Sequence, residues 1–355
     1  MGTANLQGVH MNEAEAPRRI ALLDVVRGVA LVAMAIFHGA WDVSFLRLVR
    51  FDPGESFGWT LFARLIAGTF LAVSGISLVL ATRNGIRPKA YFRRLALVAA
   101  AAVLVSAATW FVMPQGWVFF GILHQIALAG VLALPFLRAP TLVIAVASAF
   151  FLVLPQVFRA EIFAAPALWW VGLAPLPPPS FDYVPVFPWF GIVLAGVLAG
   201  RLGLQFGLDR RLAAWTPRHW PGRVLALGGR HSLLVYLVHQ PILFGFFFLI
   251  AHVVLPDTAE MAERADCRDS CMAQGLEAGE CTAYCGCAFD TIKTEGLMPA
   301  YLANSLTPIQ MATLRDSFLT CQAKSLRALG DEPPADAPPA DGPQSDAPAS
   351  AAPSR

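Results

Sequence analysis

The sequence predicts an all-α, polytopic membrane helix bundle of about seven spans, with a small disulfide-bonded helical appendage at its C-terminus. Three observations lead to this fold class. The chain of 355 residues is 56% hydrophobic and only 14% charged, whereas soluble domains are typically about 25% charged. The hydrophobic residues are concentrated in long runs that end near residue 256. All six cysteines follow that point, at positions 267, 271, 281, 285, 287 and 321.

The formal net charge of +2 is the sum of two parts with opposite charge. Residues 1–256 contain 19 Lys/Arg and 9 Asp/Glu, which gives a net charge of +10. Residues 257–355 contain 7 Lys/Arg and 15 Asp/Glu, which gives a net charge of −8. A low-hydrophobicity tail rich in Pro and Ala cannot bury a core. We therefore expect a cytoplasmic segment at 1–19, a membrane domain at 20–256, a Cys-rich extracytoplasmic helical domain at 257–330 and a disordered tail at 331–355.

Seven apolar runs approach the length of about 20 residues that a helix needs to cross a bilayer. Each should be helical, because unpaired backbone groups are costly in hydrocarbon. The first run contains Asp24 and Arg27 and is followed by further spans, so it is not a cleavable signal peptide. The predicted spans are 20–42, 59–81, 95–113, 117–137, 141–158, 186–203 and 231–255.

The positive-inside rule predicts the orientation of these spans. If the N-terminus lies in the cytoplasm, the only basic residues of the outer loops are Arg47, Arg50 and Arg159. An odd number of spans then places the C-terminal domain outside the cytoplasm. We expect the membrane to be a bacterial inner membrane, with this domain in the periplasm. The inner segments contain Arg18, Arg19, Arg83, Arg87, Lys89, Arg93, Arg94, Arg138, Arg201, Arg210, Arg211, Arg218, Arg223 and Arg230.

The cysteines agree with this orientation, because an even number in a short segment is typical of an oxidising compartment. Cys267 and Cys271, like Cys281 and Cys285, are four residues apart and so share a helix face. Two helices of a hairpin could be joined through such pairs. Six cysteines allow fifteen pairings, and the sequence does not select one. Neither paired CxxC motifs nor a CxxCH motif is present, so we expect disulfides and no metal.

Polar residues in the first span lie along one stripe. At 100° per residue, Asp24 and Asp42 coincide at 0°, while Arg27 falls at 300° and His38 at 320°. The stripe therefore occupies an arc of about 60° on a helix of 3.6 residues per turn. Asp24 and Arg27 are expected to form an ion pair that makes their burial tolerable. Asp42 lies one turn after His38 and can orient the imidazole as a general base.

Ionisable groups inside a membrane are candidates for function because they are expensive to bury. Outside the first span, Asp182 and Tyr183 stand at the outer mouth of the sixth span. A satisfied interhelical hydrogen bond is the alternative role for each such residue. The other candidates are Arg64, His124, Gln125, Arg230, His231, His239 and Gln240.

These residues lie in motifs that resemble a known family. Residues 23–38, with Leu-Asp, Arg-Gly and a final His, resemble the first helix of the transmembrane acyltransferase superfamily. More narrowly, the chain resembles the bacterial branch of the heparan-alpha-glucosaminide N-acetyltransferase catalytic-domain family. The further motifs are Phe-His-Gly-Ala-Trp-Asp at 37–42, Val-Ser-Gly-Ile-Ser-Leu at 73–78, Phe-Gly-Ile-Leu-His-Gln-Ile-Ala-Leu at 120–128, Asp-Tyr-Val-Pro-Val-Phe-Pro-Trp-Phe-Gly at 182–191 and Gly-Arg-His-Ser-Leu-Leu-Val-Tyr-Leu-Val-His-Gln-Pro at 229–241.

The resemblance implies transfer of an acyl group, typically acetyl, from cytosolic acetyl-CoA to a sugar or glycan acceptor on the far side. It implies a catalytic His38, acting as a base or carrying the acyl group, assisted by Asp42, His124 and His239. Animal members of the family have Asn at the position of His38. An acyl tunnel would be formed by Asp24, Arg27, Arg64, Asp182, Tyr183 and Gln240. The acetyl-CoA phosphates would be bound by Arg83, Arg87, Lys89, Arg93, Arg94 and Arg230. Partners would be the bilayer and the glycan, with no nucleic acid.

Two other classes of function are compatible with the sequence. A transporter or flippase also places polar residues at mid-membrane, but it predicts an inverted repeat, and no repeat is evident. A non-catalytic anchor would only present the Cys-rich domain to a periplasmic partner. Deletion of residues 257–355 separates the anchor from the acyltransferase, which should keep its transfer activity.

Overall fold

A computed structural model of the chain describes residues 19–49, 51–54, 56–254, 256–302 and 305–328. Within these ranges the regular structure is helical and contains no strand. The chain forms two compact units, residues 1–46 with 51–250 and residues 47–50 with 251–355. The expected cytoplasmic segment, apart from Arg19, and the expected tail at 331–355 lie outside the described residues.

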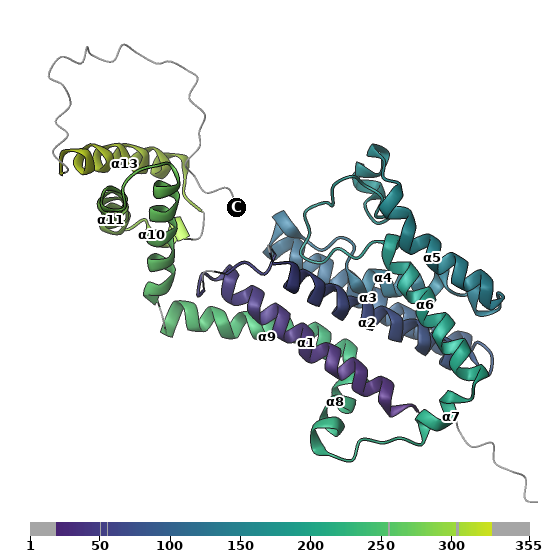
Figure 1. Cartoon of the computed structure of the whole chain (residues 1–355). Helices are drawn as coiled ribbons and strands as arrows, with labels where there is room; N and C mark the ends of the chain where they lie inside the picture. The colour runs from purple at the N-terminus through teal and green to yellow at the C-terminus, as the bar shows by residue number, and fades with distance from the viewer. Residues whose placement is uncertain (1–18, 50, 55, 255, 303–304, 329–355) are drawn as a thin grey trace, which may run out of the picture. The chain divides into compact units, whose positions relative to one another are not determined.

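The first unit is a helical bundle, shown in purple to green in Figure 1. Helix α1 packs against α8, α9 and α2, while α6 packs against α2 and α5. The helices are α1 (Ala21–Phe45), α2 (Phe57–Thr82), α3 (Pro88–Val112), α4 (Ile122–Leu132), α5 (Thr141–Val157), α6 (Val186–Gln205), α7 (Leu208–Ala213), α8 (Trp220–Arg230) and α9 (Ser232–Leu249). Short helical turns of this unit are η1 (Pro114–Gly116), η2 (Pro135–Leu137), η3 (Glu161–Ala164) and η4 (Pro166–Leu168). The π-helical η5 (Ile250–Val254) begins at the last residue of the first unit and continues into the second.

Five of the described helices are long and apolar enough to cross a membrane, namely α1, α2, α3, α6 and α9. The other two predicted spans are shorter as helices: α5 has 17 residues and α4 has 11. Eleven residues rise only about 16 Å, roughly half of a hydrocarbon layer. The apolar run at 117–137 is therefore not one continuous helix, although its hydropathy resembles that of a span.

The non-helical segment before α4 is paired with the loop before α6. The Phe181 amide donates to the Gly116 carbonyl (2.8 Å), and the Val184 amide donates to the Phe120 carbonyl (3.0 Å). Non-helical backbone is tolerated at membrane depth only where protein or a water-filled cavity satisfies it. Here two irregular segments more than 60 residues apart satisfy each other. The break before α4 is therefore specified by long-range contacts.

Two pairs of helices cross so closely that only glycine fits between their backbones. A Cβ atom at Gly28 of α1 would lie 2.1 Å from the Leu225 carbonyl oxygen of α8, and one at Gly229 would lie 1.7 Å from the Asp24 carbonyl oxygen. In the crossing of α2 and α6, a Cβ at Gly196 would lie 2.2 Å from the Ala72 oxygen. Small residues allow such approach in membrane bundles. The first crossing explains why glycine follows the arginine in the Arg-Gly motif.

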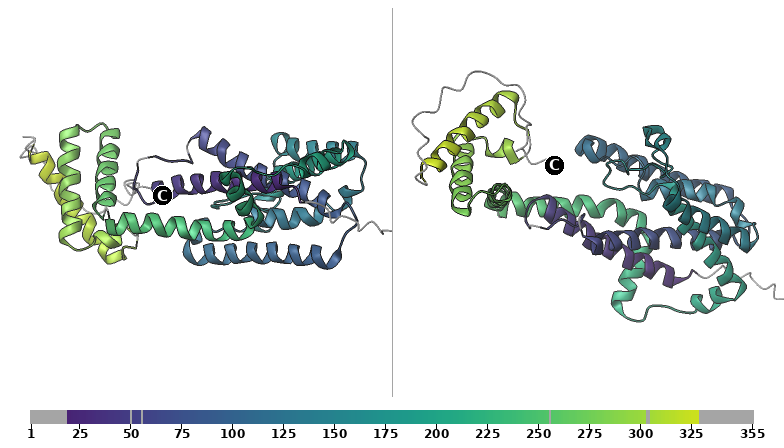
Figure 2. Two further views of the ribbon diagram at one scale, coloured as in Figure 1. Left: turned by 90° about the horizontal axis from the view of Figure 1, so that it is seen from below. Right: turned by 45° about the horizontal axis from the view of Figure 1, so that its top comes forward.

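The second unit consists of helices joined by disulfides, and Figure 2 shows its α10–α11 hairpin from two further directions. Its helices are α10 (Pro256–Ala273), α11 (Ala278–Thr294), α12 (Met298–Leu302) and α13 (Pro308–Ala328). The bonds Cys267–Cys285 and Cys271–Cys281 join α10 to α11, and Cys287–Cys321 joins α11 to α13. Disulfides were expected from the spacing of the cysteines; the pairing comes from the structure.

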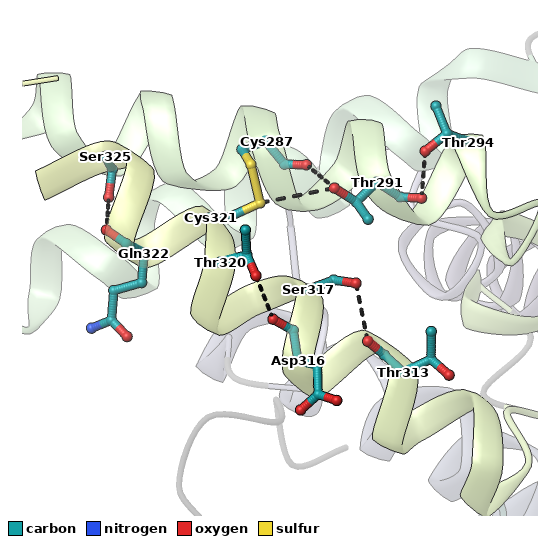
Figure 3. The surroundings of a disulfide bond; sticks show 10 residues. All are labelled: Cys287, Thr291, Thr294, Thr313, Asp316, Ser317, Thr320, Cys321, Gln322 and Ser325. Atoms are coloured by element: carbon teal, nitrogen blue, oxygen red, sulfur yellow. Dashed lines mark hydrogen bonds between the residues drawn. A yellow bond between two sulfur atoms is a disulfide. The ribbon is translucent and has the colours of Figure 1, made fainter. Parts of the chain in front are cut away.

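The third disulfide lies beside polar side chains that bond within their own helices. Figure 3 shows Thr291 donating to the Cys287 carbonyl (2.9 Å), with its hydroxyl 3.8 Å from the Cys321 sulfur. A small apolar core of Phe289, Ile292 and Leu314 packs between the same helices. The disulfides supplement this core, because it is too small to stabilise a domain of this size alone.

Candidate active site

Helices α1 and α9 bring two histidines together in the first unit. The ring centroids of His38 and His239 lie 5.1 Å apart, with an angle of 55° between the planes. Both residues were candidates from the sequence, where they are 201 positions apart. The packing of their two helices against each other was not predicted. Figure 1 shows α1 running alongside α9.

Beside the histidines, Gln240 and Asp42 form a second pair across the same two helices. The Gln240 Nε2 atom donates a hydrogen bond of 2.8 Å to Asp42 Oδ1. Asp42 is completely buried, and its Oδ2 atom has no partner, nor has Gln240 Oε1. We expected Asp42 to orient His38 from one turn away. Instead, its hydrogen bond goes to the neighbouring helix, so the carboxylate fixes α9 relative to α1.

The hydrogen bonding of His239 determines which of its nitrogens is available. Its Nδ1 atom lies 2.6 Å from the Tyr236 carbonyl oxygen, which can only accept a hydrogen bond. Nδ1 therefore carries the proton, and in the neutral ring the lone pair is on Nε2. The Nε2 atom is buried and has no partner. A free imidazole nitrogen of this kind is the group that a general base requires.

Tyr236, which the sequence analysis missed, connects His239 to the start of α4. Its hydroxyl lies 3.4 Å from Asp182 Oδ2, and the Ile122 amide donates to the same oxygen at 2.9 Å. The Asp182 carboxylate thus caps α4 from another segment, where the positive end of the helix dipole favours an anion. The signal in the sequence was weak: Tyr236 lies one turn before His239, but a tyrosine in an apolar helix is usually part of the core.

His124 differs from His239 because both of its ring nitrogens have partners. The Gly121 amide donates to Nδ1 (3.2 Å), so Nε2 carries the proton and donates to the Ser106 hydroxyl oxygen (3.2 Å). The Ser106 hydroxyl in turn donates to the Val118 carbonyl. In this arrangement His124 has no free lone pair and holds the segment before α4 in place.

The ion pair expected at the start of the first span is present where the N-terminal parts of α1 and α3 and the C-terminal part of α2 meet. Asp24 accepts hydrogen bonds from Arg19 (2.7 and 3.0 Å) and from Arg27 (3.1 Å), and Arg27 also donates to the Ser77 hydroxyl. Arg94 of α3 is close enough to interact electrostatically with Arg27 and Arg19. Two guanidinium groups thus share the carboxylate of Asp24, and a third lies nearby, which leaves an excess of positive charge.

A cavity of about 270 Å³ opens at this end, between α2, α3 and α4, with Val193 of α6 in its wall. Of the residues expected to bind phosphates, Arg87 and Arg94 line it. Its polar wall also includes Ser74 and Tyr91, whose hydroxyl donates to the Gly130 carbonyl (2.7 Å).

The remaining predicted site residues lie elsewhere in the first unit. Arg83 forms an ion pair with Asp209 (3.1 Å), and Tyr183 donates to the Trp169 carbonyl (2.7 Å). Burial raises the pKa of Tyr183 to about 12, so its hydroxyl stays protonated. Four further predicted site residues do not line the cavity, and their side chains are exposed. They are Arg64, Lys89, Arg93 and Arg230.

Among the described residues, no cluster of three or more His, Cys, Asp or Glu side chains is arranged to hold a metal ion. The six cysteines are all engaged in disulfides.

A helical bundle with several helices long and apolar enough to span a membrane, a half-buried histidine pair and a basic cavity defines a multi-pass membrane protein with a polar interior. Residues 19–241 match the family described as heparan-alpha-glucosaminide N-acetyltransferase, catalytic. The match covers more than half of the chain, which therefore belongs to this family, and membership implies transferase activity. It includes every residue of the site described above and ends before the Cys-rich unit. Comparisons with curated proteins and with solved structures returned no match.

Proposed function

We propose that the protein is an integral membrane acyltransferase that moves an acetyl group from cytosolic acetyl-CoA to a sugar or glycan on the periplasmic side of a bacterial inner membrane. Family membership supports the transfer chemistry. The observation that carries the proposal is the buried, unpartnered Nε2 atom of His239 beside the ring of His38. A purely structural bundle would gain nothing from leaving such a group without a hydrogen bond.

The donor is proposed to enter at the basic end. Arg19 and Arg27 share the single carboxylate of Asp24, and Arg87 and Arg94 line the adjacent cavity. Phosphate groups are bound well by guanidinium groups, which offer several donors in a fixed plane. The positive-inside rule places this end in the cytoplasm, where acetyl-CoA is made. Arg83, Lys89, Arg93 and Arg230 would contribute to attracting the donor from the surface.

The histidine pair is about 21 Å along α1 from Asp24, at a rise of 1.5 Å per residue. We propose that His239 Nε2 accepts the proton of the acceptor hydroxyl or amine as that atom attacks the thioester carbonyl. The new bond forms at the acetyl carbon, the carbon–sulfur bond breaks, and the departing sulfur receives the proton from His239. In the alternative sequence a ring nitrogen of His38 attacks the thioester carbonyl, the carbon–sulfur bond breaks, and CoA leaves as the thiol with the proton of the His38 ring. His239 then takes the proton of the acceptor as the acceptor attacks acetyl-His38, and that proton passes to the departing His38 ring.

The acceptor is proposed to approach from the end of the bundle that holds Asp182, Tyr183 and Tyr236. Asp182 and Tyr236 belong to the hydrogen-bond chain that ends at His239. Gln240 and Asp42 each leave one oxygen without a partner at the same level. Hydroxyl-rich ligands such as sugars offer the donors that these oxygens need.

The decisive experiment uses purified protein in proteoliposomes, with acetyl-CoA labelled in its acetyl group and a periplasmic glycan extract. Transfer of label to the glycan is expected, and variants of His38 and His239 should abolish it. Complete absence of transfer from the wild-type protein across a broad set of sugars would overturn the proposal.

One observation favours a transporter as the second candidate. The helix α4 begins after a non-helical segment and points its N-terminus at the Asp182 carboxylate, and interrupted helices of this kind occur at the binding sites of transporters. A transporter would move a sugar across proteoliposomes in the absence of acetyl-CoA. The acyltransferase predicts no such movement, only transfer of label.

The Cys-rich unit lies outside the family match, and we propose that it folds in the periplasm, because three disulfides require an oxidising compartment. An anchor whose only role is to present this unit would have no use for the polar interior of the bundle. Deletion of 257–355 should therefore leave the rate of acetyl transfer close to that of the full chain.

A further inference from the structure

Gln125 of α4 is a buried amide without any hydrogen-bond partner. The side chain is 1% exposed, and neither its Nε2 nor its Oε1 atom has a partner. Buried amides in proteins are nearly always hydrogen-bonded, because an unpaired polar group loses its hydration without compensation. Both halves of this amide are therefore available to a ligand.

The position of Gln125 along α4 places it between the two ends of the proposed reaction path. Ala129, one turn later on the same helix face, lines the cavity, as do Ile126 and Gly130. One turn earlier, the Ile122 amide binds the Asp182 carboxylate, which is linked through Tyr236 to His239. Gln125 itself does not line the cavity, and it lies along α4 between the cavity-lining residues and the Asp182 carboxylate. His124, the other polar side chain of this part of α4, already has partners on both ring nitrogens.

We infer that Gln125 binds the two amide groups of the pantetheine arm of the acyl donor as the arm extends from the cavity toward the histidine pair. The inference rests on the proposed function, which supplies the donor. A primary amide donates through Nε2 and accepts through Oε1, so it can donate to the carbonyl of one secondary amide and accept from the N–H of another. The pantetheine arm contains two such amides. A lone phosphate oxygen or ether oxygen would leave the Gln125 Nε2 or Oε1 atom unpaired. Gln125 is a positioning residue for the donor and takes no part in proton transfer.

The test compares Gln125→Met, which keeps length and removes both hydrogen bonds, with the matched control Leu128→Met on the same helix. Leu128 packs against the core and does not line the cavity. Each protein is assayed with acetyl-CoA and with S-ethyl thioacetate, which has the same thioester but no amide. Gln125→Met should raise KM for acetyl-CoA about tenfold to thirtyfold, the value of two hydrogen bonds. Its kcat/KM for S-ethyl thioacetate should equal that of the wild type.

Equal losses with both donors, or no loss with either, would overturn the inference. A binding measurement separates its failure from that of the proposed function. Pantetheine, which lacks all phosphates, should raise the unfolding temperature of the wild type and of Leu128→Met, but not that of Gln125→Met. If the wild type shows this selective binding and transfers no acetyl group, the amide site stands and the proposed reaction fails. If pantetheine stabilises all three proteins equally, the amide site is wrong.

Discussion

The Nε2 atom of Gln240 donates a hydrogen bond to Oδ1 of Asp42, although the two residues are 198 positions apart in the chain. This bond and the neighbouring pair of His38 and His239 join α1 and α9 at one level. The first and last long helices of the transferase unit therefore assemble the site together.

His38 is proposed to work next to the reacting acetyl group. His38→Ala should lower acetyl transfer about 10²-fold to 10⁴-fold, the usual contribution of an acid–base group, while the protein still inserts and binds CoA. Transfer of labelled acetyl-CoA measures the first effect, and CoA-induced thermal stabilisation measures the second. Full activity in this variant would exclude His38 from the chemistry.

His239→Gln should abolish turnover because glutamine has no basic lone pair to accept a proton. Leu237→Met on the same helix is the matched control and should keep wild-type turnover. The same variant decides between the two proposed sequences of steps. If His38 carries the acetyl group, His239→Gln incubated with labelled acetyl-CoA and no acceptor should accumulate label on His38; if His239 acts directly on the acceptor, the protein stays unlabelled.

Gln240→Leu should destabilise the bundle, because it leaves the buried Asp42 carboxylate without its hydrogen bond. The loss of a bond to a buried charged group costs about 1.5–3 kcal/mol. Adding Asp42→Asn to this variant removes the charge and should recover part of the loss. Thermal unfolding in detergent measures both effects; additive losses in the double variant would show that the two side chains do not interact.

Gly229→Ala should disrupt the crossing of α1 and α8, since the added Cβ would lie 1.7 Å from the Asp24 carbonyl oxygen. Overpacking typically costs about 1–3 kcal/mol, and here the obstacle is rigid backbone. The control is the adjacent Gly228→Ala, where no atom lies within 4 Å of the new Cβ. The yield of monodisperse protein should fall sharply for the first variant only. Equal yields would contradict the close crossing.

The stability of the Cys-rich unit should depend on pH through Glu260. Burial raises the pKa of this carboxyl, but hydrogen bonds and charges from Lys293 and Arg264 outweigh that effect and hold it below its ordinary value. A lowered folded pKa stabilises the unit above the unfolded pKa, near 4.5, and the benefit is lost as the pH falls through the folded pKa. Glu260→Gln should therefore increase hydrogen exchange in α10 and α11 at pH 7 and have little effect at pH 3. An equal effect at both pH values would contradict the ion-pair origin.

The sequence predicted the membrane bundle, the disulfide-bonded appendage and the polar stripe because these follow from local composition and helical periodicity. It did not predict the break before α4, because an extended apolar segment paired with residues 180–184 has the same hydropathy as a helix. The sequence did not determine the disulfide pairing either. Cysteines one turn apart lie on the same helix face, and this spacing is compatible with several different pairings.

Site residues were predicted unevenly for a similar reason. His38 and His239 stand out in the sequence as ionisable groups in apolar helices. Tyr236 and Gln125 do not, since their importance depends on partners, or on missing partners, that only the packed helices reveal. His124 was named for the same reason as His239, and only its hydrogen bonds distinguish the two.

Because the site needs both α1 and α9, its chemistry depends on the order in which the ribosome delivers the chain. His38 enters the membrane early, but His239 and Gln240 follow only after some 200 further residues have been synthesised and inserted. A nascent chain that stops before α9 contains only half of the proposed site and would be unable to carry out the proposed transfer. The site would be complete only after the last helix of this unit has been synthesised.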